Sequence, residues 1–198
     1  MKNREYRSME FRISEDNEYI VEGYAATFEP YVLFSEDGVD YSERIEPTAF
    51  DDTDLTDVVF RIDHQGPVFA RTSAGSVQLF VDDHGLGNVT DLSRTQRSRD
   101  IFEEIKAGNY PKMSFAFTVE ADHYERATHT RVIDRIAKVF DISPVSFPAN
   151  PGTELSARDY FDGVIEAEKA ERLERERQEQ AKRKLQLRIK IGGYLDGN

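Results

Sequence analysis

The sequence predicts a mainly β body, with an antiparallel sheet and a few helices, followed by one long charged helix. Residues 113–120 alternate apolar and polar side chains with a period of two, which is typical of a β-strand with one buried face. A second long strand is expected over 131–143, after a polar turn near 125–128. From about Asp159 to Lys190 the chain consists mostly of Glu, Arg, Lys, Gln and Ala, which favours a long helix that either extends through solvent or pairs with another chain.

The remaining strands are predicted from β-branched and aromatic residues that lie between turn signals. They span residues 6–13, 19–28, 58–62, 76–81 and 86–90. Residues 15–17 predict a turn between the first two strands, and the acidic stretch 29–42 predicts a loop. The Gly-Pro pair at 66–67 is expected to stop the strand before it, and Pro144 and Pro148 are expected to end the sheet.

Two helices are predicted within the body. Residues 45–50 favour a short helix, because a proline is tolerated in the first turn. A longer helix is expected over 95–107, since Ser93 or Thr95 can cap its N-terminus. In the charged C-terminal segment, the Gly-Gly pair at 192–193 is expected to end the helix.

We divide the chain into a body, residues 1–158, and a helical tail, residues 159–198. The net charge of −12 is spread unevenly between them. Residues 1–165 carry 17 Lys and Arg against 31 Asp and Glu, a net −14, whereas residues 166–198 carry 9 against 7, a net +2. An acidic body argues against nucleic acid as the main partner.

Several classes of site are excluded by composition. Cysteine is absent, which rules out disulfides, zinc–thiolate sites and a cysteine nucleophile. No apolar run approaches the ~18 residues of a membrane span, and the N-terminus lacks the apolar segment of a secretion signal. There is no His-Glu-x-x-His and no histidine pair at helical spacing, so we expect neither a metal nor a cofactor.

Three predicted strands carry the residue types of a serine hydrolase. Ser114 alternates with apolar residues, and its small neighbour Ala116 leaves room for a substrate backbone. His64 ends an apolar strand, and histidine as a residue type titrates near neutrality, which suits a general base. Asp141 lies mid-strand, where a carboxylate must face water, pair with a cation or orient a partner such as His64, because an unpaired buried carboxylate is costly. Asp63 competes for that role, but adjacent strand residues point to opposite faces.

Each of these residues also has an ordinary structural interpretation. A serine on a strand is usually outward-facing or hydrogen-bonded, and a histidine at a strand end is more often a surface residue. His84, His123 and His129 compete as the base, although they lie in or beside polar turns. The order His, Ser, Asp along the chain differs from the orders in chymotrypsin, subtilisin and the α/β-hydrolases, so a converging trio would belong to another fold.

Five segments stand in a fixed order within residues 5–155. They are Gly23-Tyr24-Ala25-Ala26-Thr27-Phe28, Glu43-Arg44-Ile45-Glu46-Pro47-Thr48-Ala49-Phe50, the strand ending at His64, Met113-Ser114-Phe115-Ala116-Phe117, and Asp141-Ile142-Ser143-Pro144-Val145-Ser146 followed by Pro148-Ala149-Asn150-Pro151. In this order they resemble the motifs of the prohead (capsid maturation) serine proteases of tailed bacteriophages, a family distantly similar to the herpesvirus assembly proteases. Two positions depart from the pattern, since glycine is usual at Thr48 and glutamate at Asp141.

The resemblance implies a closed, barrel-like sheet and a serine endopeptidase. By position, Ser114 is the nucleophile, His64 the base and Asp141 the residue that orients the histidine. Aspartate is one methylene shorter than glutamate, so Asp141 must approach His64 more closely, and a degenerate protease follows if it cannot reach. The candidate oxyanion donors are backbone N–H groups near Ser114 or one of three arginines, namely Arg94, Arg97 and Arg99.

The resemblance also implies partners and a location. The substrates would be the scaffold segment of the major capsid protein and the protease itself, and the portal and a second copy are further partners left open. Cleavage would take place inside the assembling prohead in the host cytoplasm. The charged tail would then be a scaffold-like helix that carries the protease into the particle, or simply a solubilising helix. The alternative function is a non-enzymatic assembly factor with the same β body and helical arm.

Overall fold

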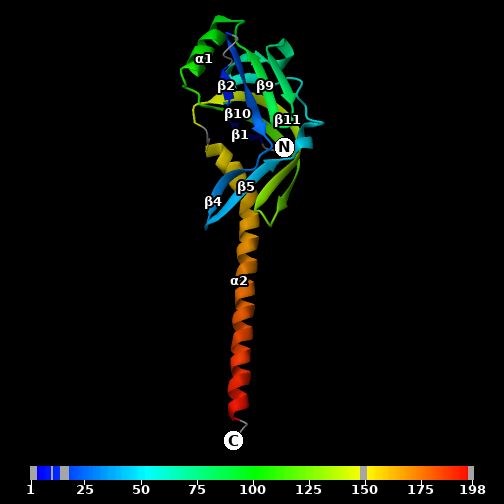
Figure 1. Cartoon of the computed structure of the whole chain (residues 1–198), viewed down its shortest axis with the longest axis vertical. Coiled ribbons are helices and arrows are strands. Elements are labelled where there is room, and N and C mark those ends of the chain that lie inside the picture. Colours follow the sequence, from blue (N-terminus) through cyan, green and yellow to red (C-terminus); the bar gives the residue numbers. More distant parts are fainter. Residues whose placement is uncertain (1–3, 10, 14–17, 148–150, 196–198) are drawn as a thin grey trace. The chain divides into compact units, whose positions relative to one another are not determined.

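The computed structural model describes residues 4–9, 11–13, 18–147 and 151–195. The chain forms two compact units, Met1–Ser156 and Ala157–Asn198. The first unit contains the strands and the helix α1 (Gln96–Lys106), and is mainly β as predicted. The second unit consists of the continuation of α2 (Pro151–Leu195), the long helix in Figure 1.

The larger sheet has seven strands in the order β1-β10-β11-β5-β4, with β6 paired to β11 and β7 paired to β6 (Figure 1). Its strands are β1 (Glu5–Met9), β4 (Tyr31–Glu36), β5 (Val39–Ile45), β6 (Val59–Ile62), β7 (Gln65–Arg71), β10 (Lys112–Glu125) and β11 (Thr130–Val145). β10 and β11 form a long antiparallel hairpin. β5 pairs in parallel with the start of β11, and β6 pairs in parallel with Asp141 and Ile142 near its end. The strand that leads to His64 therefore lies beside Asp141.

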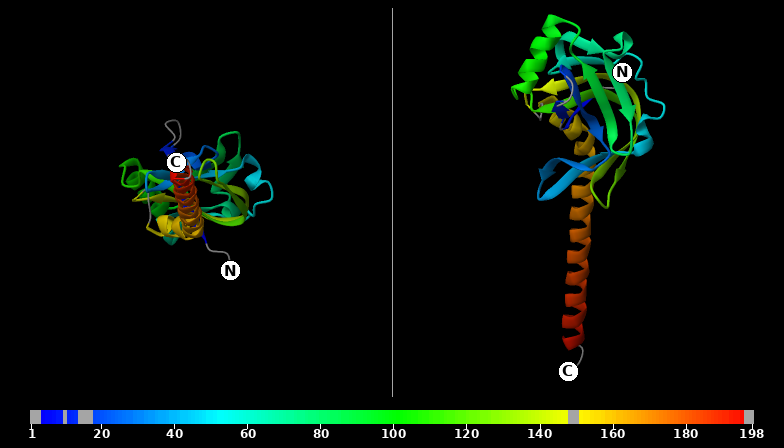
Figure 2. Two further views of the ribbon diagram at one scale, coloured as in Figure 1. Left: turned by 90° about the horizontal axis from the view of Figure 1, so that it is seen from below. Right: turned by 45° about the horizontal axis from the view of Figure 1, so that its top comes forward.

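The smaller sheet has four antiparallel strands in the order β2-β3-β9-β8 (Figure 2). They are β2 (Phe11–Ile13), β3 (Ile20–Thr27), β9 (Gly85–Asp91) and β8 (Val77–Val81). Among the described residues neither sheet closes on itself, so the barrel-like closure that the family resemblance implies is not confirmed.

One apolar core joins the two sheets and α1. The four-stranded sheet contributes side chains such as Val21 and Leu86, and the seven-stranded sheet contributes Phe60, Phe115 and Ile142, all five fully buried. Helix α1 adds two buried residues, Phe102 and Ile105. This helix was predicted over 95–107, and the hydroxyl of Thr95, its N-cap, accepts a hydrogen bond from the backbone N–H of Ser98.

The β10–β11 hairpin separates the core from the polar side chains of interest. Phe115 and Ile142 pair in the register and are part of the core, whereas the preceding pair, Ser114 and Ser143, faces the other way because successive strand residues alternate. Asp141 lies two residues before Ser143 and shares its face. The predicted period of two over 113–120 thus holds, and it brings Ser114 and Asp141 to one face of the sheet.

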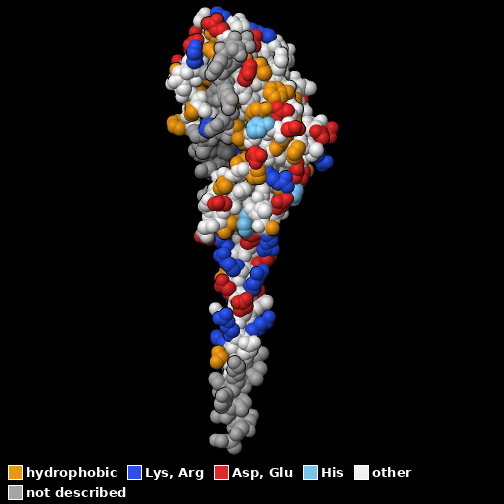
Figure 3. Space-filling view, viewed as in Figure 1, with side chains coloured by type: hydrophobic (Ala, Val, Ile, Leu, Met, Phe, Trp, Pro, Cys, Tyr) orange, Lys and Arg blue, Asp and Glu red, His pale blue; other side chains and the backbone are white. Residues whose placement is uncertain are grey.

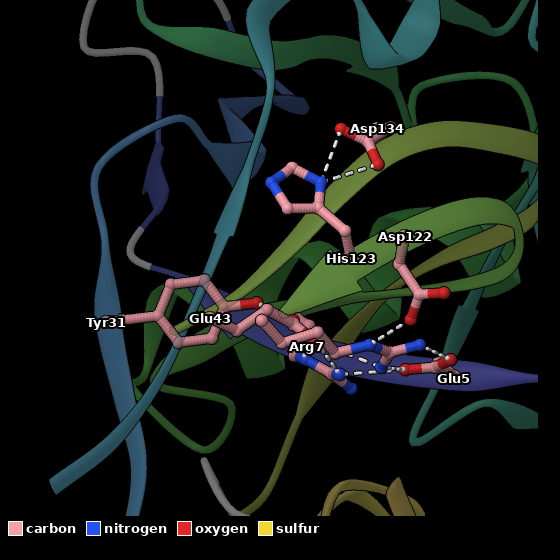
Figure 4. A network of polar contacts seen from close by, with 8 residues as sticks. Glu5, Arg7, Tyr31, Glu43, Asp122, His123 and Asp134 are labelled. Carbon is pink, nitrogen blue, oxygen red and sulfur yellow. Dashed lines mark hydrogen bonds and ion pairs between the residues drawn. The ribbon is translucent and has the colours of Figure 1, made fainter. Parts of the chain in front are cut away.

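The N-terminal strand β1 is held to the sheet by a buried charge cluster, which we define as Glu5, Arg7, Glu43 and Arg131 (Figure 4). Arg7 donates to both oxygens of Glu43, and its Nη2 lies 2.8 Å from Glu5 Oε2. Arg131 pairs with both oxygens of Glu5, at 2.6 and 2.9 Å, and its Nη1 lies 3.2 Å from Glu43. The hydroxyl of Tyr31 on β4 also donates to Glu43. Three strands of the larger sheet, β1, β5 and β11, therefore meet at this cluster, and β4 contacts it through Tyr31.

Opposed effects act on the ionisation of this cluster. Burial acts to raise the pKa of Glu43, but the charge and hydrogen bonds of Arg7, followed by Arg131, outweigh burial and lower it below the usual value of 4.5. Burial likewise acts to lower the pKa of Arg7, but the charge of Glu43 dominates and holds it above its usual value. Glu43 and Arg7 are therefore both ionised throughout the neutral pH range.

Helix α2 is polar along its exposed length. Residues 170–184 are all exposed, and acidic and basic side chains are interspersed on their surface (Figure 3). In the part of the chain that the structure describes, no helix is both long enough and apolar enough to cross a membrane. The expected end at residues 192–193 is wrong, because the helix continues to Leu195. An interior glycine costs a helix only about 1 kcal/mol, so the pair weakens the helix without stopping it.

Other predicted boundaries are also wrong. The strand expected over 6–13 is two strands, β1 and β2, which belong to different sheets. The loop expected over 29–42 contains the β4–β5 hairpin, turned at Asp37 and Gly38, which both have positive φ. The turn expected at 15–17 and the motif residues 148–150 lie outside the described residues.

Two prolines that were expected to end strands, Pro67 and Pro144, lie inside strands of the larger sheet. The Gly-Pro pair at 66–67 lies inside β7, which among the described strands pairs only with β6. An edge strand accepts proline because one side of its backbone has no ladder to complete. Pro144 lies inside β11 opposite Met113, and its carbonyl accepts from the backbone N–H of Asp63 at 3.0 Å. The sheet therefore extends past Asp141 and connects to the turn that carries His64.

Candidate active site

His64 lies in a two-residue turn between β6 and β7, and not at the end of an interrupted strand. Ile62 and Gln65 pair across the turn, and the two residues between them, Asp63 and His64, have φ values of 48° and 57°. Tight hairpins of this kind require left-handed backbone at both central positions, which Asp and His adopt more readily than most residues. The turn projects the imidazole from the tip of a hairpin.

The neighbouring carboxylate, Asp63, anchors this turn to the segment after β11. Its two oxygens accept hydrogen bonds from the backbone N–H and the hydroxyl of Ser146, at 2.8 and 2.7 Å. On the other side, Nη1 of Arg61 donates to the carbonyl of His64 at 3.3 Å. Asp63, which by sequence competes with Asp141 to orient His64, has Ser146 as its partner instead. It fixes the place of the turn over β11.

Ser114 lies within hydrogen-bonding distance of the imidazole. Its Oγ is 2.7 Å from Nε2 of His64, and the serine is only 2% exposed. The contact joins β10 to the β6–β7 turn, 50 residues apart in the chain. Nucleophile–base pairs in serine hydrolases have the same separation, about 2.6–3.2 Å.

Asp141 completes the series on the other ring nitrogen. Its Oδ1 lies 2.6 Å from Nδ1 of His64, so the shorter aspartate does reach the imidazole. The approach is possible because β6 pairs directly with β11 at this residue. The same oxygen accepts a hydrogen bond from Ser143, whose Oγ lies 2.8 Å away. All three residues of the predicted trio therefore converge, and Ser143 is a contact that sequence reasoning missed.

The three histidines that competed with His64 lie elsewhere. His84 packs edge-on against Tyr24, with ring centroids 4.4 Å apart. His123 pairs with Asp134 at 2.8 Å on the exposed face of the β10–β11 hairpin (Figure 4). His129 accepts from or donates to the hydroxyl of Tyr124 at 2.9 Å. None of these contacts involves Ser114.

The arginines considered as oxyanion donors have other partners. Arg94 pairs with Asp91 at 3.0 Å and donates to the carbonyls of residues 74 and 75. Arg99 donates to the carbonyl of Ser93 and to Gln96. The guanidinium of Arg97 lies over the ring of Phe69, 5.5 Å from its centroid. None of these contacts involves Ser114 or His64.

In the part of the chain that the structure describes, no group of three or more His, Cys, Asp or Glu side chains is placed to hold a metal ion. The site contains a serine hydroxyl, an imidazole and a carboxylate in one hydrogen-bonded series, and these groups are nearly buried. This arrangement defines a class, the serine peptidases and related hydrolases, in which a base activates a hydroxyl and an acid orients the base.

The family follows from comparison with known proteins. Residues 5–164 match the family described as the caudovirus prohead serine protease. The match covers most of the chain, and the chain therefore belongs to this family. Neither the curated proteins nor the solved structures include a significant match to it. The match spans the three residues that converge in the site.

Proposed function

We propose that this chain is a serine endopeptidase of prohead maturation, with Ser114 as nucleophile, His64 as general base and Asp141 as the orienting carboxylate. The observation that carries the proposal is the unbroken series from Ser114 Oγ to His64 Nε2 and from Nδ1 to Asp141 Oδ1, at 2.7 and 2.6 Å. Family membership supports peptide-bond hydrolysis as the reaction.

In the acylation step, the imidazole carries its proton on Nδ1, where Asp141 accepts the hydrogen bond, and Nε2 is free to act as a base. Ser114 Oγ attacks the carbonyl carbon of the scissile peptide while its proton passes to Nε2. The C–N bond then breaks, and His64 returns the proton to the leaving amine. An acyl ester on Ser114 is left.

In the deacylation step, water attacks the ester carbonyl and gives its proton to the same nitrogen. The proton then returns to Ser114 as the acid product leaves, so the enzyme is unchanged after one turnover. Asp141 keeps its hydrogen bond to Nδ1 and stabilises the imidazolium that forms twice per cycle. The near-complete burial of Ser114 and Asp141 strengthens these hydrogen bonds relative to water.

We assign the substrates and the location on the same basis. Membership of a prohead protease family supports capsid proteins as partners and the interior of the assembling prohead, in the host cytoplasm, as the place of action. Within that frame we propose cleavage of the scaffold segment of capsid proteins and of the protease itself. The portal and a second copy of the chain are further proposed partners.

The proposal is tested with a fluorophosphonate probe and intact mass spectrometry of the purified chain. We expect the wild type to take up one probe on Ser114 and to release fragments by self-cleavage, and Ser114→Ala to do neither. Ser73→Ala, which alters an exposed serine that donates to Asp57, is the matched control and should behave as wild type. Equal fragmentation of the wild type and Ser114→Ala would remove Ser114 from the mechanism. A wild type that takes up no probe would favour the non-enzymatic assembly factor.

We further propose that residues 1–158 are the protease domain and that 159–198 deliver it to the particle. The exposed, mixed-charge surface of α2 supports a helix that associates through charge with other proteins of the shell. Deleting residues 163–198 should lower the number of protease copies per particle, counted by quantitative mass spectrometry of purified proheads. Unchanged incorporation would leave the tail as a solubilising helix.

A further inference from the structure

Ser143 is a fully buried serine whose hydroxyl contacts the carboxylate of the site. It is 0% exposed, and its Oγ donates to Oδ1 of Asp141 at 2.8 Å. The same oxygen lies 2.6 Å from Nδ1 of His64. One carboxylate oxygen therefore accepts two hydrogen bonds, one from the ring and one from this serine.

The position of Ser143 on β11 brings its side chain next to Asp141. Ser143 lies two residues beyond Asp141 on β11, so both side chains point to the same face. It is also the register partner of Ser114 on β10. The hydroxyl is thus enclosed between the strand that carries the nucleophile and the residue that orients the base.

We propose that Ser143 is a positioning residue of the site, which holds the Asp141 carboxylate in the orientation that meets His64 and shares its negative charge. This inference rests on the proposed function. The terminal torsion of aspartate is broad, so one hydrogen bond to the imidazole does not fix the carboxylate plane. A nearly buried carboxylate is also costly unless donors satisfy it. The Ser143 hydroxyl meets both requirements without adding a charge.

A merely structural serine would behave differently from a positioning residue. If the Ser143 hydroxyl merely donates to the nearest acceptor, its removal would change the free energy of unfolding but would not change the pH at which His64 becomes protonated. If it positions Asp141, its removal concentrates the carboxylate charge on the imidazolium. The protonated ring is then stabilised, and activity, which needs the neutral ring, should begin at a higher pH.

The first test measures probe labelling of Ser114 and self-cleavage as functions of pH in the full chain. Hydrogen bonds to charged groups contribute enough that Ser143→Ala should lower both rates by roughly 10- to 100-fold, with the acidic limb of the profile moved to higher pH. Ser143→Thr keeps the hydroxyl and should recover most of the rate. The control is Thr90→Val, which removes a fully buried hydroxyl in β9 that accepts from Asn88 at 3.0 Å; its profile should match wild type. An unmoved acidic limb in Ser143→Ala, with rates within about twofold of wild type, would overturn the proposal.

A second measurement separates this inference from the proposed function. The NMR resonance of the His64 Nδ1 proton is recorded in Ser114→Ala, a background without a nucleophile. Adding Ser143→Ala should shift that resonance, whereas adding Thr90→Val should not. A shift together with an unreactive wild type would retain the positioning contact and reject the protease. If the wild type is reactive but Ser143→Ala does not shift the resonance, the proposed protease function stands and the role of Ser143 is rejected.

Discussion

Two buried polar clusters share strand β11 but lie on opposite faces of the larger sheet. In the register of β1 with β10, Arg7 of the charge cluster lies opposite Phe115, whereas the neighbouring β1 residue lies opposite Ser114. The site on the Ser114 face contains one carboxylate, one imidazole and two hydroxyls in contact. The charge cluster contains two arginines and two glutamates.

The charge cluster consists of groups that keep their charge, whereas the site contains groups that can exchange a proton. Arg7 and Glu43 shift each other's pKa in opposite directions, so both stay ionised and their attraction persists over a wide pH range. The site instead contains an imidazole between a hydroxyl and a carboxylate, an arrangement in which a proton can move. We infer that the charge cluster holds β1 in place and that the other cluster performs the chemistry.

The largest expected effect is on activity, from Asp141→Asn. The amide presents the wrong tautomer of the histidine to Ser114, and equivalent changes in other serine proteases cost about 10⁴ in rate. The free energy of unfolding should change far less, because the side-chain volume is nearly unchanged. The measurements are the rate of probe labelling at Ser114 and the urea midpoint. Labelling within tenfold of wild type would show that Asp141 does not orient His64.

The next effect is on stability, from Arg7→Met. This change leaves Glu43 buried with one arginine fewer, and breaking a buried pair in this way costs about 3–5 kcal/mol. Arg71→Met is the matched control, because Arg71 pairs with Asp57 while both side chains are more than 40% exposed. That pair should contribute far less, because solvent screens its charges. Equal losses in the two variants, measured by urea unfolding, would mean that burial of the charge cluster does not matter.

Local pattern was sufficient to predict much of the molecule. Three local features each predicted an element that is present: the alternation over 113–120, the Thr95 cap and the charged composition after Asp159. Each depends only on residues close together in the chain. The site residues were chosen from residue type, strand placement and motif order. Their convergence depends on the parallel pairing of β6 with β11 at Asp141, which no local signal encodes.

The missed features share a non-local origin. The sequence around Pro67 and Pro144 reads as breaks, because proline lacks a donor, yet edge placement and a carbonyl contact make both tolerable. By sequence Glu43 looks like a surface residue of a polar segment, but in the fold it contacts Arg7 and Arg131 from strands distant in the chain. Ser143 looks like an ordinary strand serine until the register places it beside Asp141.

A smaller effect should appear in the acid stability of the charge cluster. The folded-state pKa of Glu43 is lowered below its usual 4.5, so the stability it contributes is fully present above about that pH. The contribution is lost as the pH falls through the lowered value. The difference in unfolding free energy between wild type and Glu43→Gln should therefore be constant near neutrality and shrink below pH 4.5. Parallel stability curves from pH 7 to pH 3 would contradict a charged Glu43.

The smallest effect is expected at the exposed pair of His123 and Asp134, and its pH dependence has the opposite sign. The hydrogen bond that His123 donates to Asp134 raises the pKa of His123 above the usual 6.5, so this pair stabilises the fold fully below 6.5 and loses its effect as the pH rises through the raised value. Both side chains are more than a third exposed, so solvent screening limits the contribution to a few tenths of a kcal/mol. His123→Gln should lower the urea midpoint slightly at pH 6 and leave it unchanged at pH 9. A loss at pH 9 as large as that at pH 6 would mean that packing, and not charge, is what His123 contributes. Labelling at Ser114 should be unaffected in either case, since no contact links His123 to the site among the described residues.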